Sequence, residues 1–255
     1  MQLLKVNNLH ASYEGVSAVQ GVTLVLDEAE IVGLCGPNKA GKSTLCKCLA
    51  GSKSPDNGEL IFNGRDITSV PTSRRIQFGL SLCPEGRGIY SEMSVKDNLR
   101  VGSNGISARE EERKRNHILS YFPILSERLN QQAGTLSGGE AQMLGIAKKL
   151  MRMPRLLVVD EPSLGLSPNS VRAVFQTLAK VRDEFGVSIL LVEEAITRLS
   201  GWVDRVYVMN RGALVSQGKI KEIINSAAVS SAFAGELDEV AITEKSDVER
   251  KGSYA

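Results

Sequence analysis

The fold is decided by one loop, Gly36-Pro37-Asn38-Lys39-Ala40-Gly41-Lys42-Ser43-Thr44, and by what flanks it. The strand-like apolar run Glu30–Cys35 precedes this loop, and a helical pattern from about Lys42 to Ala50 follows it. A glycine-containing loop that ends in Gly-Lys-Ser between a buried strand and a helix is the phosphate-binding loop. Backbone N–H groups and the positive helix end hold the phosphates, Lys42 reaches the β- and γ-phosphates, and Ser43 completes the Mg²⁺ shell. The loop therefore predicts a nucleotide site that takes ATP and Mg²⁺.

A pair of adjacent acids closes a second apolar run further along the chain. The run Leu156–Val159 reads as a central strand and ends in Asp160 and Glu161, followed by Pro162. With a phosphate loop upstream, Asp160 is expected to hold Mg²⁺ directly or through water, and Glu161 to orient or deprotonate the attacking water. The alternative is two acids that face solvent at a strand end.

Two glycines and a serine precede another helical pattern, which runs from about Glu140 to Met151. Ser137, Gly138 and Gly139 at this helix start make a second anion-binding nest. One nucleotide does not need two such nests on one chain. The second nest therefore indicates a nucleotide held by a partner chain.

The sequence from residue 2 to about residue 235 resembles the ABC ATPase family, through LSGGE (Leu136–Glu140) between the phosphate loop and LLVVDEP (Leu156–Pro162). The resemblance implies two subunits that sandwich two ATP molecules head to tail, each between one phosphate loop and the partner's Ser137–Gly139 nest. It implies that Tyr13 stacks on adenine. It also places Glu85 where the family usually has a metal-binding glutamine, and it aligns Ser163–Pro168 with a loop that here lacks the usual aspartate.

Three further stretches look most like the shorter ATPase of branched-chain amino acid importers: PEGRGIY (Pro84–Tyr90), EPSLGLSP (Glu161–Pro168) and LLVEEA (Leu190–Ala195). Urea and short-amide importers use similar ATPases. The resemblance implies a second ATPase subunit in a homo- or heterodimer, membrane permease subunits, and indirectly a solute-binding protein. It implies a peripheral position on the cytoplasmic face of the inner membrane.

Two residues depart from the family pattern. Lys39 replaces a glycine, and if the backbone there has positive φ, a lysine costs about 1 kcal/mol or more. Glu194 stands at the family's switch histidine, where its carboxylate would repel the γ-phosphate by about 4 kcal/mol at about 4 Å and an effective dielectric of about 20. Glu194 must turn away, take up a proton or meet a cation such as Lys39. We expect this chain's own ATP site to be slow.

Composition sets the remaining limits. The 255 residues carry a net charge of +2 and are 42% hydrophobic, which is ordinary for a globular protein and gives no general electrostatic case for binding nucleic acid. No apolar run approaches the ~18 residues that a membrane-spanning helix needs. The four cysteines are expected to be buried, reduced thiols.

Strand runs alternating with helical patterns predict an α/β fold with a mixed or parallel sheet, an N-terminal antiparallel β part and an inserted helical subdomain. The expected ATPase domain spans residues 1–235, with the helical subdomain at about 85–154. A polar turn is expected at Ala11–Gly15, and helices at Ala108–Phe122 and Pro168–Phe185. Residues 236–255 are predicted to be a disordered polar tail.

Other functions stay open at this stage. One is an ABC ATPase of DNA repair or translation, although the chain lacks the long coiled-coil insertion and the second ATPase half of those proteins. Another is a subunit that binds ATP as a signal and hydrolyses little, which Lys39 and Glu194 would favour. The transported solute belongs to the partner subunits and is not encoded here.

Overall fold

The computed structural model describes residues 1–103 and 105–233, and the predicted tail at 236–255 lies outside the described residues. The first sheet is antiparallel, with strand order β2-β1-β4-β5. Its strands are β1 (Gln2–Tyr13), β2 (Val16–Asp27), β4 (Asn57–Phe62) and β5 (Arg65–Asp66). The predicted turn at Ala11–Gly15 is shorter than expected, because β1 continues through Tyr13. Glu14 and Gly15 make the turn, both with positive φ, as tight hairpin turns require.

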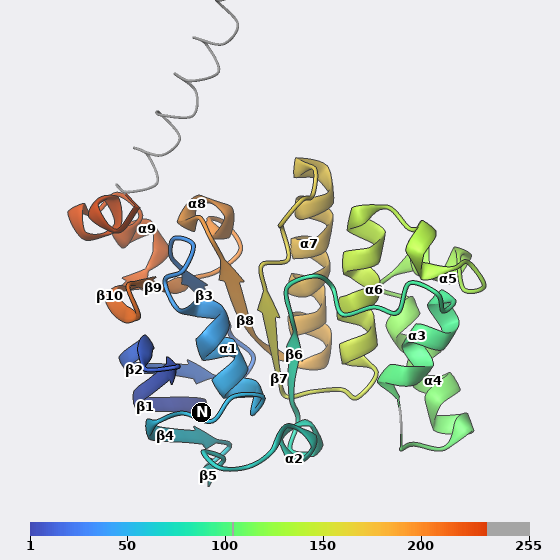
Figure 1. Cartoon of the computed structure of the whole chain (residues 1–255). Coiled ribbons are helices and arrows are strands. Elements are labelled where there is room, and N and C mark those ends of the chain that lie inside the picture. The colour runs from blue at the N-terminus through green and yellow to red at the C-terminus, as the bar shows by residue number, and fades with distance from the viewer. Residues whose placement is uncertain (104, 234–255) are drawn as a thin grey trace, which may run out of the picture.

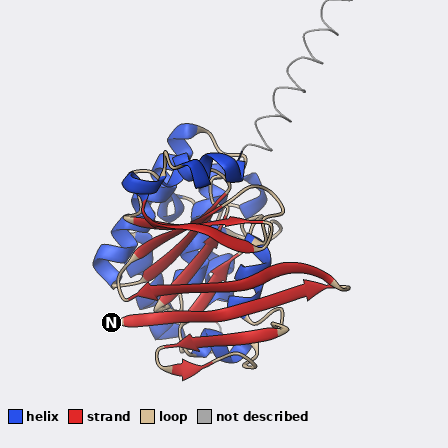
Figure 2. Ribbon diagram, turned by 90° about the vertical axis from the view of Figure 1, so that its left-hand side faces the viewer, coloured by secondary structure: helices blue, strands red, loops and turns tan. Residues whose placement is uncertain are grey.

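The second sheet is mixed, with strand order β10-β9-β3-β8-β7-β6. Only β10 and β9 pair antiparallel. Figure 2 shows these strands lying above those of the first sheet. The six strands are β3 (Ile31–Cys35), β6 (Leu80–Cys83), β7 (Leu156–Asp160), β8 (Ser188–Glu193), β9 (Arg205–Asn210) and β10 (Ala213–Lys219). The predicted α/β class with a mixed sheet and an antiparallel N-terminal part is confirmed.

The central strands are buried on both faces, which explains their continuous apolar sequences. Alternate residues of β7 face different cores: Leu156 and Val158 pack toward the first sheet and helix α1 (Lys42–Ala50), whereas Leu157 and Val159 pack toward the other helices. The parallel strands β3, β7 and β8 end at one sheet edge, where Cys35 is opposite Glu193 and Asp160 is opposite Val192. Residues that follow these strands therefore meet there.

Helices fill the chain between β6 and β7 and gather on one side of the molecule, away from the antiparallel sheet (Figure 1). They are α3 (Val95–Gly102), α4 (Ala108–Leu119), α5 (Pro123–Glu127) and α6 (Gly138–Leu150), with a short 3₁₀ turn at Ala133–Thr135. The predicted helix Ala108–Phe122 thus ends at Leu119. The predicted helix at Glu140 begins two residues earlier, at Gly138. We keep the division into a core and a helical subdomain at about 85–154 as a proposal.

The remaining helices cover the sheets or follow strands: α2 (Thr72–Gln77), α7 (Pro168–Phe185), α8 (Ile196–Leu199), α9 (Ile220–Ile223) and a helical turn at residues 227–233. The bounds of α7 match the prediction. All four cysteines are buried and free, as predicted. Within the described ranges, no helix is both long enough and apolar enough to cross a bilayer.

Candidate nucleotide site

The phosphate loop leaves β3 and enters α1 at the shared strand edge, as predicted. Two of its glycines are required by close approach: a Cβ at Gly36 would lie 2.1 Å from the Met209 carbonyl oxygen, and one at Gly41 would lie 2.2 Å from that of Ala18. Lys42 is only 4% exposed. Its Nζ donates to the carbonyl oxygens of Gly36 at 2.7 Å and Pro37 at 3.1 Å, so the loop curls around its own ammonium group.

The predicted acids lie beside this lysine at the end of β7. Glu161 Oε1 is 3.4 Å from Lys42 Nζ. Asp160 is buried, with 4% of its surface exposed, and its Oδ1 atom has no hydrogen-bond partner. Burial raises the pKa of Asp160 to about 6, and the charges of Glu161 and Glu85 add to the rise, while Ser43 and Lys42 oppose it. The contacts of Ser43 and Lys42 therefore compensate only in part for the burial of this carboxylate.

An open cavity of about 380 Å³ brings most of the predicted residues together. It is lined by Ala18, Glu85, Glu161 and every loop residue from Asn38 to Thr44. Tyr13 is not among its lining residues. It lies at the end of β1, 45% exposed, with Lys53 Nζ 4.4 Å from its ring centroid. Stacking of Tyr13 on adenine stays a prediction.

The residues around Asp160 fit a magnesium ion. In the described part of the chain, no group of three or more His, Cys, Asp and Glu side chains is arranged to hold a metal. Mg²⁺ needs no such cage, because it keeps several waters and takes one or two protein oxygens beside substrate phosphates. The unpartnered Oδ1 of Asp160 and the neighbouring Ser43 hydroxyl would supply those oxygens. Glu85 lines the same cavity and is exposed.

The second nest is built differently. Ser137 caps α6, its hydroxyl accepting the Glu140 N–H, and Glu140 Oε2 accepts the Ser137 N–H at 2.8 Å. Burial acts to raise the pKa of Glu140, but hydrogen bonds from Ser137 and the charge of Arg128 hold it below its usual value. Neither Ser137 nor its two glycines line the phosphate-loop cavity. Within one chain, the structure does not bring the two nests together.

Comparisons with known proteins agree with this geometry. The sequence profile of the ABC transporter family matches residues 19–164, more than half of the chain. The chain belongs to the ABC transporter ATP-binding family. Its nucleotide-binding elements are those of an ABC-type ATPase.

Several relatives match this ABC ATPase along nearly their whole length. The branched-chain amino acid transport ATP-binding protein BraG of Pseudomonas aeruginosa is 34% identical, over 91% of this chain and 100% of its own length. The lipopolysaccharide export ATP-binding protein LptB of Escherichia coli is 32% identical, over 92% and 98%. The crystal structure of the ADP conformation of MJ1267, an ATP-binding cassette of an ABC transporter, superposes with a TM-score of 0.84. It is 26% identical and covers 92% of this chain and 99% of its own.

Both departures from the ABC ATPase pattern lie at the cavity or beside it. The backbone at Lys39 has φ 65°, so the condition for strain at that lysine is met. Glu194 Oε1 accepts a hydrogen bond from Asn38 Nδ2 at 2.6 Å. Between these described residues no ion pair joins Glu194 to Lys39, so the cation partner considered above is replaced by a neutral amide.

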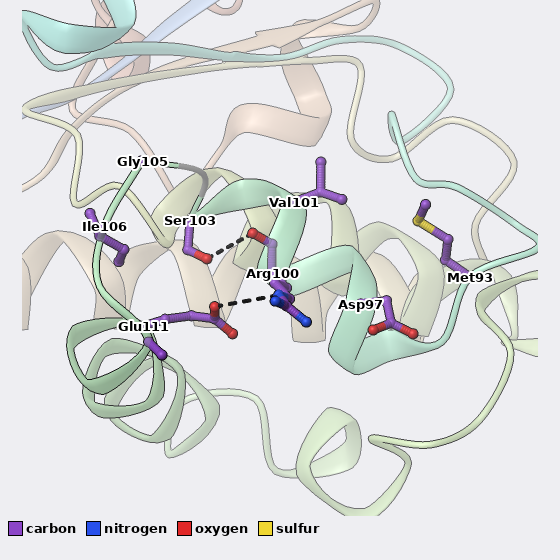
Figure 3. Close-up of a pocket in the computed structure, with 9 residues that line it drawn as sticks. Met93, Asp97, Arg100, Val101, Ser103, Gly105, Ile106 and Glu111 are labelled. Atoms are coloured by element: carbon purple, nitrogen blue, oxygen red, sulfur yellow. Dashed lines mark hydrogen bonds and ion pairs between the residues drawn. The ribbon is translucent and has the colours of Figure 1, made fainter.

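A different hollow, of about 580 Å³, lies in the helical region (Figure 3). It is larger than the phosphate-loop cavity, yet no residue predicted for the site lines it. Its lining includes Arg100 and Glu111, which form an ion pair at 3.9 Å, and Ser103, whose hydroxyl donates to the Arg100 carbonyl. The nucleotide is expected at the phosphate loop instead, because the anion-binding loop and the buried Lys42 line that cavity.

Glu193, the residue before Glu194, is not singled out by the sequence pattern, yet it is completely buried. It accepts hydrogen bonds from Ser163, in the loop after Glu161. The signal available in the sequence is an acid that ends an apolar strand, the same signal that identified Asp160. Only the packing distinguishes the buried Glu193 from the half-buried Glu194.

Proposed function

We propose that this chain is the ATP-hydrolysing subunit of an importer for branched-chain or related amino acids, and that it drives transport through partner membrane subunits. The observation that carries the hydrolytic role is the gathering of Lys42, Ser43 and Glu161 at one cavity, with Asp160 buried beside them. Phosphoryl transfer needs these parts: a cation for the phosphates, metal ligands and a group that orients water.

Each side chain then has a distinct task. Lys42 exchanges its contacts with the loop carbonyls for the β- and γ-phosphates of ATP. Ser43 and Asp160 would hold Mg²⁺, which would neutralise charge on the phosphate oxygens. Glu161 accepts the proton of the attacking water, or orients that water, from its place beside Lys42. Tyr13 would supply a face for the adenine, and Glu85, in the loop after β6, would be a further metal ligand.

The second nest acts across a dimer. ABC ATPase subunits generally dimerise and work with membrane permeases, and the MJ0796 cassette is described as dimeric in a post-hydrolysis state with ADP and phosphate. We propose that Ser137, Gly138 and Gly139 contact the γ-phosphate of a nucleotide bound to a second ATPase subunit. Phosphate binding then closes the pair and phosphate loss opens it. The permeases would hold both subunits at the cytoplasmic face of the inner membrane, with a solute-binding protein acting on the far side.

The solute proposal rests on relatives. BraG and the probable LivF of Archaeoglobus fulgidus, 30% identical over 92% of this chain, are named for branched-chain amino acid transport. LptB, similar at 32%, is named for lipopolysaccharide export. Urea or amide import is the nearest alternative within the importer group. The chain reconstituted with its permeases and binding protein should take up leucine or valine only with ATP. Uptake of urea instead, or stimulation of phosphate release only by lipopolysaccharide, would refute the amino acid assignment.

A subunit that binds ATP but hydrolyses little is the second candidate. It is favoured by the strained backbone at Lys39 and by the carboxylate of Glu194 bound to the phosphate loop. Steady-state phosphate release with the partner subunits present separates the two. A rate that Glu161→Gln does not lower would favour the regulatory role, and a rate that it abolishes would favour the motor.

A further inference from the structure

The carboxylate of Glu193 is bound on both oxygens by one residue of a neighbouring loop. Oε1 accepts the Ser163 N–H at 3.1 Å, and Oε2 accepts the Ser163 hydroxyl at 2.7 Å. Arg198 Nη1 donates to the same hydroxyl at 3.0 Å and lies 3.5 Å from Glu193 Oε2. Glu193 is 0% exposed and Ser163 is 4% exposed, whereas Arg198 reaches them from the surface with 43% of its side chain exposed. The Glu193–Ser163 contact is therefore buried, with a partner on each carboxylate oxygen, and it fixes the position of Ser163.

Ser163 belongs to the segment that presents the hydrolytic glutamate. Glu161 lies two residues earlier, with φ 47°, a left-handed backbone that is uncommon for residues other than glycine. Its N–H donates to the Val192 carbonyl at 3.0 Å. Two neighbours at the end of β8, Val192 and Glu193, therefore hold the segment on either side of Pro162. Such strained backbone persists only where surrounding contacts over-determine it.

Burying the carboxylate of Glu193 costs free energy, because a charged group loses its contact with water. Replacing a buried ion pair with apolar residues of similar volume is often neutral or stabilising, so the presence of the pair is weak evidence for a stability role. Here the carboxylate accepts two hydrogen bonds from Ser163 and a contact from Arg198, and these contacts are stronger to a charged acceptor than to a neutral one. Its neighbour Glu194 holds Asn38 of the phosphate loop, so the end of β8 contacts both sides of the cavity.

We propose that Glu193 is a positioning residue for ATP hydrolysis: by holding Ser163, it fixes the left-handed backbone at Glu161 and keeps that carboxylate directed at the nucleotide cavity. The inference rests on the proposed role of Glu161. It predicts that loosening the contact slows the chemical step and leaves nucleotide binding intact, because Ser163 does not line the phosphate-loop cavity. Misplacing a reacting group by about 1 Å can cost about a hundredfold in rate.

The test is steady-state phosphate release by the full chain with MgATP, for Glu193→Gln, Ser163→Ala and the double variant. We expect kcat to fall at least tenfold in each single variant, with KM for ATP within about twofold of wild type. The double variant should fall no further than the more damaged single one, because both changes break one contact. If Glu193→Gln does not fold, Ser163→Ala, which removes one oxygen, decides the question.

Ser188→Ala is the matched control. Ser188 is equally buried, at the opposite end of β8, and its hydroxyl accepts the Ala29 N–H at 2.8 Å. It should lower Tm and leave kcat unchanged. An unchanged kcat in Ser163→Ala and Glu193→Gln, a rise in KM alone, or additive losses would overturn the positioning role. Glu161→Gln is measured alongside: full turnover there would overturn the role of Glu161 itself, whereas loss there without loss in the Glu193 variant overturns only the positioning.

Discussion

Two neighbouring strands, β7 and β8, end in a pair of acids, and the two pairs have opposite surroundings. Asp160 and Glu193 are both buried, but Asp160 Oδ1 has no partner, whereas both oxygens of Glu193 are hydrogen-bonded. Glu161 faces a lysine, and Glu194 faces an amide. A buried oxygen without a partner is costly unless a ligand uses it. We therefore infer that the acids of β7 serve the nucleotide and metal, and that those of β8 hold the loops around them.

The largest effect is expected at Glu161, the acid that faces the cavity. Glu161→Gln keeps the size of the side chain and removes its basicity, so turnover should fall by about 10²–10⁴-fold. ATP binding should be retained, and an ATP-bound dimer should accumulate, because hydrolysis no longer opens it. Phosphate release measures the turnover, and gel filtration with ATP detects the ATP-bound dimer. Rapid turnover by this variant would refute the catalytic role of Glu161 at the end of β7.

Asp160 should destabilise the protein when metal is absent. In magnesium-free buffer at pH 8, Asp160→Asn should raise the free energy of unfolding by about 2–3 kcal/mol, because a pKa raised to about 6 is worth about 1.4 kcal/mol per unit. The pKa of Asp160 is higher in the folded state than in the unfolded state. The contribution of this carboxyl to the stability of the wild type is therefore largest below about pH 4, where it is protonated, and that contribution is lost as pH rises through about 6.

Urea unfolding of the wild type and of Asp160→Asn at about pH 4 and at about pH 8 tests this prediction. The gain of Asp160→Asn should be small near pH 4 and full above pH 7. With MgATP present the order should reverse, since the variant loses a metal ligand. An equal gain at both pH values would show that burial of the charge is not its cause.

A smaller effect is expected at Glu194, the acid of β8 nearest the phosphate loop. Glu194→His restores the family residue, and Glu194→Gln keeps an acceptor for Asn38 while removing the charge. Both should raise single-site turnover several-fold, up to about tenfold, because a carboxylate near the γ-phosphate is repulsive. Single-turnover kinetics measure the rate. No gain in either variant would mean that Glu194 already turns away from the nucleotide.

The smallest effect is expected at Lys39. Lys39→Gly should stabilise the fold by about 1 kcal/mol, because glycine adopts positive φ without strain. Arg211→Gly is a matched control, since Arg211 is also exposed and has φ 47°. Chemical denaturation compares the two. A gain at Arg211 without one at Lys39 would show that the phosphate loop compensates for its lysine through other contacts.

Neighbouring residues in the sequence determine many of the structural elements of this protein. The phosphate loop, the apolar strands that end at Asp160 and Glu193, and the helix that follows Ser167 are each decided by neighbouring residues. Glycine placement, period-two burial and helix caps act over a few positions. That is why the α/β class and the gathering of Lys42, Ser43 and Glu161 could be predicted. The short helices α2, α5, α8 and α9 carry too few residues for a periodic signal.

The arrangement around β8 could be decided only by the folded chain. Ser163 and Glu193 are separated by 30 positions, and Asn38 and Glu194 by 156. Their contacts follow from the register that sets Cys35 opposite Glu193 and Asp160 opposite Val192. A one-residue shift in a strand exchanges its two faces. Two consecutive glutamates look alike in sequence, and the packing of three parallel strands buries one and leaves the other at the nucleotide loop.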